Sequence, residues 1–132
     1  METVVLVYSD DRSVRSDVRD ALGTTLGGEN LVIREAATQA AVLMELDGGD
    51  IDCCVFDAEA TPAGGMGLCK QIHDEYEACP PVVLLIARAA DSWLAAWSLA
   101  EAVQSFPVDP LTFPKVVEDL VFVEVDEVAE AA

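Results

Sequence analysis

The sequence predicts an α/β domain in which a parallel sheet of five strands is doubly wound, a (βα)5 sandwich with helices on both faces. Three observations support this fold class. Short apolar runs alternate with helical patterns five times along the chain, and parallel strands need such helical crossovers. The central runs 4–7 and 82–86 are apolar at every position, as burial on both faces requires. The length of 132 residues suits one domain with its own core.

The expected strands are short runs identified by their hydrophobic periodicity. The first, TVVLVY, lies next to the N-terminus, and the fourth, PVVLLI, has the strongest apolar character. These runs cover residues 3–8, 31–36, 51–56, 81–86 and about 102–106.

The expected helices carry apolar residues three or four positions apart and have start or stop signals at their ends. In the first, Val14, Val18 and Leu22 recur at four-residue steps. Thr38 is the expected N-cap of the second helix and Asp91 that of the fourth. The helices cover residues 11–22, 38–47, 65–77, 91–99 and a stretch that starts after Asp109–Pro110.

The chain shows no linker and no internal repeat, so we expect a single domain over residues 1–122. Residues 123–132, VEVDEVAEAA, are expected to form an acidic tail or an extension of the last helix.

The composition argues against two classes of partner. The net charge of −18, from 25 acidic and seven basic residues, repels phosphate backbones and anionic membrane surfaces. We therefore expect no nucleic-acid partner and no membrane contact. No apolar run approaches the roughly 18 residues of a membrane span, and the N-terminus lacks the basic region of a signal peptide. These features favour a cytoplasmic protein.

Acidic residues gather where two of the expected strands end. Asp57 ends the third strand, and Ser9, Asp10 and Asp11 end the first. The crevice outside the carboxyl ends of such a sheet is where ligands bind, so we expect these side chains to share one solvent-facing mouth. Converging carboxylates repel one another unless a hard cation neutralises them. Mg²⁺ is the expected ligand.

Four segments in register resemble the receiver domain of two-component response regulators, whose fold is flavodoxin-like. VLVYSDDRSVR resembles the family's first strand with its acidic cluster, and DCCVFDAEATPAGGMGLCKQI resembles the segment that carries the phosphorylated aspartate. PPVVLLIAR resembles the fourth strand and SFPVDP the end of the fifth. The resemblance covers about residues 3–122, and AGGMGLC and WLAAW are most similar to stand-alone receivers of actinobacteria.

The resemblance implies roles for individual residues. Asp57 matches the phospho-acceptor, which a histidine kinase or a small phosphodonor would phosphorylate. Asp10 and Asp57 match Mg²⁺ ligands, and Glu59 matches a third ligand through its backbone carbonyl. Asp11 is expected at the rim. The resemblance also implies a signalling module rather than an enzyme.

The sequence departs from the family pattern at four positions. Ser9 replaces the first acid of the usual pair, and Ile86 replaces the hydroxyl residue that ends the fourth strand. Phe106 replaces the lysine before the proline of the fifth strand, and Val103 replaces the aromatic switch residue. We therefore expect a degenerate receiver that acts through protein contacts, with weak Mg²⁺ binding and weak or absent phosphorylation of Asp57. A conventional phosphorylated receiver is the alternative, and a flavodoxin-like enzyme or flavin carrier is a third interpretation.

Other residues have a structural and a functional interpretation. Trp93 and Trp97 lie four positions apart, and we expect core packing; the alternative is a partner surface or homodimer contact that Phe106 extends. His73 is expected on a solvated helix face. The AGGMG segment matches no nucleotide-binding loop. The four cysteines lack C-x-x-C spacing and are expected to be buried free thiols.

Overall fold

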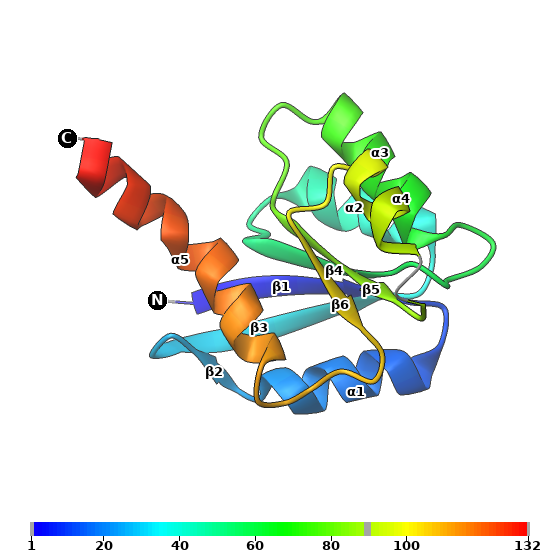
Figure 1. Cartoon of the computed structure of the whole chain (residues 1–132), viewed down its shortest axis with the longest axis horizontal. Helices are drawn as coiled ribbons and strands as arrows, with labels where there is room; N and C mark the ends of the chain where they lie inside the picture. Colours follow the sequence, from blue (N-terminus) through cyan, green and yellow to red (C-terminus); the bar gives the residue numbers. More distant parts are fainter. Residues whose placement is uncertain (1, 89–90, 132) are drawn as a thin grey trace.

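The protein is an α/β sandwich built on one sheet of six strands in the order β2-β3-β1-β4-β5-β6 (Figure 1). The computed structural model describes the backbone of residues 2–88 and 91–131, and the side chains of residues 2–88 and 91–122. The elements are β1 (Glu2–Tyr8), α1 (Arg12–Leu22), β2 (Thr25–Leu26), β3 (Glu29–Ala36), α2 (Gln39–Gly48), β4 (Cys53–Asp57), α3 (Gly65–Glu75), β5 (Val82–Ile86), α4 (Ser92–Trp97), β6 (Ala102–Ser105) and α5 (Phe113–Ala131).

The five predicted strands are confirmed as β1, β3, β4, β5 and β6, and they pair in parallel. The prediction of a purely parallel sheet is wrong, because β2 adds a sixth strand that runs antiparallel to β3. Gly27 and Gly28 form the turn between β2 and β3, and their φ angles of 57° and 83° are those of the tight turn that a twisted hairpin favours. A strand of two residues carries too little periodicity to be recognised in the sequence.

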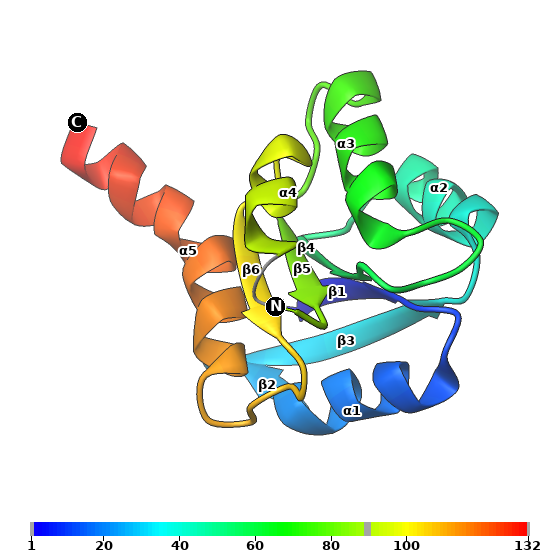
Figure 2. The ribbon, with the colours of Figure 1, turned by 45° about the vertical axis from the view of Figure 1, so that its right-hand side comes forward.

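The core lies in two layers, one on each face of the sheet, because side chains alternate along every strand. Helices cover both faces of the sheet (Figure 2). In β1, for example, Leu6 and Tyr8 point to the face covered by α2, α3 and α4, whereas Val5 and Val7 point to the face covered by α1 and α5. Burial on both faces explains why the central strands are apolar at every position.

Polar side chains begin two of the helices. Thr38 accepts a hydrogen bond from the N–H of Ala41 and caps α2 as predicted, and Asp11 caps α1 by accepting from the N–H of Ser13. The prediction that Asp91 caps α4 is wrong, because its side chain makes no capping bond and instead forms an ion pair with Arg88. The helix is also shorter than predicted.

The cysteines are free thiols, as expected, with three buried and Cys79 half-buried. Burial raises the pKa of Cys53 and of Cys69 to about 12, so both thiols stay protonated at neutral pH. Among the described residues, no helix is long and apolar enough to cross a membrane.

Candidate functional site at the carboxyl ends of the strands

Asp57 is the last residue of β4, and its carboxylate is held by two protein donors. The hydroxyl of Ser9 donates to Oδ2 at 2.7 Å, and the backbone N–H of Glu59 donates to Oδ1 at 2.8 Å. Asp57 is only 3% exposed and Ser9 is fully buried. Burying a carboxylate costs free energy unless it is hydrogen-bonded, and these two contacts provide the hydrogen bonds.

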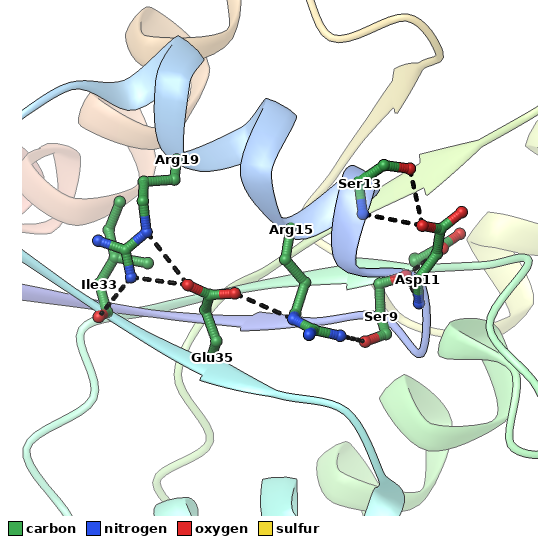
Figure 3. Close-up of polar contacts among 8 residues, drawn as sticks. Ser9, Asp11, Ser13, Arg15, Arg19, Ile33 and Glu35 are labelled. Carbon is green, nitrogen blue, oxygen red and sulfur yellow. Dashed lines mark hydrogen bonds and ion pairs between the residues drawn. The ribbon is translucent and has the colours of Figure 1, made fainter.

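Ser9 is fixed from three directions at the end of β1 (Figure 3). Its N–H donates to the carbonyl of Ala36 at 3.2 Å, and its hydroxyl accepts the N–H of Asp11 at 3.0 Å. Its carbonyl accepts from the guanidinium of Arg15 at 2.7 Å. Ser9 is therefore a rigidly held hydrogen-bond donor to Asp57. The sequence shows that Ser9 replaces an acid of the family pattern, but it does not predict this hydrogen bond.

Arg15 in turn belongs to an ion-pair group that joins α1 to β3 (Figure 3). Arg15 and Arg19 contact the two carboxylate oxygens of Glu35 at 2.9 and 2.8 Å. Hydrogen bonding from Arg19, followed by that from Arg15, lowers the pKa of Glu35. Glu35 thus remains ionised and orients the guanidinium that holds the Ser9 carbonyl.

Asp10 lies exposed at the same mouth, and both of its oxygens accept hydrogen bonds from Thr61. The Thr61 N–H and hydroxyl donate to Oδ1 and Oδ2, each at 3.1 Å. Burial raises the pKa of Tyr8, and the charges of Asp10 and Asp57 raise it further. The role of Thr61 had no signal in the sequence.

Asp11 lies at the start of α1, and its carboxylate is engaged there. Its carboxylate accepts bonds from the N–H and the hydroxyl of Ser13 at 2.8 and 2.7 Å, and the side-chain bond is the largest cause of its lowered pKa. Asp11 is thus committed to starting α1.

The neighbouring strand ends present apolar side chains. Ile86 ends β5 and is buried, and its carbonyl accepts the N–H of Phe106 at 3.0 Å. Phe106 packs against the core layer beneath α1 and α5, and Val103 packs against the opposite layer. Neither Ile86 nor Phe106 offers a side-chain group that could donate a hydrogen bond to a phosphoryl oxygen.

The donor set at this mouth suits a hard cation, but only in part. The carboxylates of Asp10 and Asp57 and the backbone carbonyl of Glu59 are the oxygen ligands that Mg²⁺ prefers. However, all four carboxylate oxygens already accept hydrogen bonds. Within the described part of the chain, no group of three His, Cys, Asp or Glu side chains is arranged to hold a metal ion. A cation would therefore meet fewer charged ligands than a three-carboxylate site provides.

Comparison with known proteins places the chain in a family, although no protein-family model matches it. An uncharacterized response regulatory protein of Mycobacterium tuberculosis strain H37Rv is 45% identical over 118 residues, which span 88% of this chain and 89% of the relative. A protein with the same description from strain CDC 1551 matches equally well. The chain belongs to the response regulators.

Solved receiver domains share the fold of this response regulator at low sequence identity. A CheY-like receiver domain from Methanospirillum hungatei has a TM-score of 0.78 at 17% identity and covers 96% of this chain and 99% of its own. The receiver domain of a Francisella response regulator has a TM-score of 0.79 at 18% identity, with 92% and 98% covered. CheY4 of Vibrio cholerae has a TM-score of 0.75 at 18% identity, with 91% and 99% covered. The flavodoxin-like receiver fold is thereby confirmed.

Three predictions about side chains elsewhere in the receiver are wrong. Trp93 and Trp97 do not pack in the core, because they are 71% and 55% exposed on α4. Phe106 packs beneath α1 and α5 instead of joining them. His73 is not solvated: its ring nitrogens lie 2.8 Å from the carbonyl oxygen of Cys69 and 2.9 Å from a carboxylate oxygen of Glu101. These contacts tie α3 to the segment before β6.

Proposed function

We propose that this response regulator is a degenerate receiver, a cytoplasmic signalling module that acts through protein contacts and accepts phosphate at Asp57 weakly or not at all. The arrangement around Asp57 carries this proposal. Ser9 donates a hydrogen bond to the acceptor carboxylate, where the family pattern has a second acid, and Ile86 and Phe106 take the places of the hydroxyl and the lysine.

Phosphorylation would proceed by attack of an Asp57 oxygen on the phosphorus of a phosphohistidine or a small phosphodonor, whose leaving group departs with the bonding electron pair. Mg²⁺, held by Asp10, Asp57 and the carbonyl of Glu59, would neutralise the charge on the phosphoryl oxygens. Each Asp57 oxygen already accepts one hydrogen bond, which makes it a weaker nucleophile than a free carboxylate oxygen. Each missing ionic contact to the phosphoryl group withholds roughly 1.5–3 kcal/mol, so the phosphorylated state gains little stability.

A weak response follows from the same contacts. A ligand shifts a conformational equilibrium only by its differential affinity for the two states. With Phe106 in place of the lysine and Val103 in place of the aromatic switch, the chain lacks the usual means of sensing the phosphoryl group. Protein contacts that do not depend on phosphorylation are then the more effective output.

Incubation of the full chain with acetyl phosphate and Mg²⁺ tests the proposal, with intact mass as the measurement. We expect an adduct of well under one phosphoryl group per chain, and we expect the Asp57→Asn variant to show no adduct. A stoichiometric adduct that disappears in the Asp57→Asn variant would contradict the proposal and support a conventional receiver phosphorylated by a histidine kinase.

The exposed tryptophans of α4 are the proposed centre of the protein contact, here between two copies of the chain. Residues 92–100, SWLAAWSLA, carry no charge in a chain with a net charge of −18, so the side chains of this segment add nothing to the charge repulsion between copies. Large aromatic side chains also supply much of the binding energy at interface centres.

Light scattering over a range of protein concentrations tests this contact. We expect a concentration-dependent dimer, and we expect Trp93→Ala with Trp97→Ala to weaken it by about thirtyfold or more, the effect of losing about 2 kcal/mol at a hot spot. Met44→Ala is the matched control, because Met44 is similarly exposed but lies on α2. A monomer at every concentration would exclude the homodimer.

A further inference from the structure

The carboxylate of Asp10 can bind either Thr61 or a divalent cation, and the structure shows it bound to Thr61. Its two oxygens accept the N–H and the hydroxyl of Thr61. Thr61 belongs to the loop between β4 and α3, so this pair joins the end of β1 to the loop that covers Asp57. The second partner would be a divalent cation at the mouth of the sheet.

The same loop is anchored to the site at two further points. The N–H of Glu59 donates to Asp57, and the hydroxyl of Tyr8 donates to the carbonyl of Ala63. Residues 59–63 are therefore held on both sides of Thr61, at Glu59 by the end of β4 and at Ala63 by Tyr8 of β1, and the side chain of Thr61 is placed on Asp10 by this framework.

Asp57 and Asp11 cannot take the place of Asp10 without breaking contacts of their own. Asp57 is nearly buried and accepts from Ser9 and Glu59. Asp11 is turned to cap α1 through Ser13. The residue that precedes Asp10 is a serine whose hydroxyl already donates to Asp57.

We propose that Thr61 competes with divalent metal for the carboxylate of Asp10, so that Thr61 sets the metal affinity of the site and metal binding releases Thr61 from Asp10. This inference rests on the proposed function only for the identity of the metal ligands. The physical reason is that Mg²⁺ demands near-octahedral oxygen ligands at short distances, whereas both oxygens of Asp10 accept hydrogen bonds from Thr61. Thr61 is thus a positioning residue that opposes metal binding.

A magnesium titration followed by backbone amide NMR of the full chain tests the competition. Thr61→Val keeps the shape of the side chain but removes the hydroxyl donor. We expect this variant to bind Mg²⁺ about tenfold more tightly than the wild type, the effect of one hydrogen bond to a charged group. Thr25→Val is the matched control, since Thr25 is exposed on β2 at the far edge of the sheet, and it should leave the affinity unchanged. Asp10→Asn should abolish binding in either background.

Hydrogen exchange at single amides provides a second measurement. In the wild type, Mg²⁺ should accelerate exchange at the Thr61 amide, because its acceptor moves to the metal. The amide of Ala58, which donates to the carbonyl of Leu85 at 2.9 Å, should be unaffected. Unfolding by urea shows whether the valine variant keeps its stability, and the control variant shows the general effect of the substitution.

Two results would overturn the inference. One is equal Mg²⁺ affinity in the wild type and Thr61→Val together with unchanged exchange at the Thr61 amide. The other is the absence of metal binding in both proteins, which would mean that freeing Asp10 does not create a site. Neither result would contradict the degenerate receiver, which requires no metal. A stoichiometric phosphoryl adduct would contradict that proposal and leave the competition at Asp10 intact.

Discussion

Replacing Phe106 with lysine is expected to raise the ratio of phosphorylated to free Asp57 by about tenfold to a hundredfold. Phe106 follows β6, and its N–H is bonded to the carbonyl of Ile86 at the end of β5, so its side chain starts at the same edge of the sheet as Asp57. A lysine there could reach a phosphoryl oxygen, and such a charged contact is worth roughly 1.5–3 kcal/mol. Intact mass after incubation with acetyl phosphate and Mg²⁺ measures the ratio.

Phe106→Met is the matched control, because it also removes the ring and leaves an unbranched side chain without charge. Both variants lose contacts with the layer beneath α1 and α5, and urea unfolding shows whether they remain folded to the same extent. Adding Ser9→Asp and Ile86→Thr to the lysine variant would restore the other two groups and should increase the adduct further. Equal adducts in the lysine and methionine variants would show that the missing charge is not what limits phosphorylation.

Gly65→Ala is expected to destabilise the protein by about 1–3 kcal/mol, the usual cost of overpacking a filled site. Gly65 is the first residue of α3, and a Cβ built there would lie 2.6 Å from the backbone oxygen of Asp57 and 2.8 Å from its carbonyl carbon. Because both atoms belong to the backbone, either α3 or the end of β4 must move. Urea unfolding at constant pH measures the change in free energy.

Gly67→Ala supplies the control in the same helix. A Cβ at Gly67 meets nothing within 4 Å, and alanine favours a helix interior over glycine by up to about 1 kcal/mol. This variant should therefore be as stable as the wild type or more stable. If Gly65→Ala matched it, the close approach of α3 to the end of β4 would not limit the packing at Asp57.

The positions of the main strands could be predicted because burial on both faces leaves a plain pattern. Residues 4–7 and 82–86 are apolar throughout, and both segments are central strands with side chains in the two core layers. The β2–β3 hairpin could not be predicted in the same way. Its first strand has two residues, and its pairing with β3 arises from the glycine turn and the neighbouring edge rather than from a periodic pattern.

The tryptophans show the limit of a periodic pattern. Trp93 and Trp97 lie one helical turn apart, which places them on one side of a helix, but the spacing does not say whether that side meets the sheet or the solvent. In α4 the buried position is Ala95, so the small residue faces the core and the large ones face outward. Which side of α4 is buried depends on how the helix is rotated about its axis, and its packing against the sheet sets that rotation.

The sequence by itself determined that this chain is an α/β receiver with Asp57 at a strand end. Apolar periodicity and the order of the four motifs can be read directly from the amino-acid sequence. It also determined which groups of the family pattern are replaced at Ser9, Ile86 and Phe106. Only the tertiary structure decided the contacts of those groups: Ser9 on Asp57, and Thr61 on Asp10. The physical reason is that a hydrogen bond depends on distances and directions between atoms that lie about fifty residues apart in the chain, 48 and 51 residues respectively.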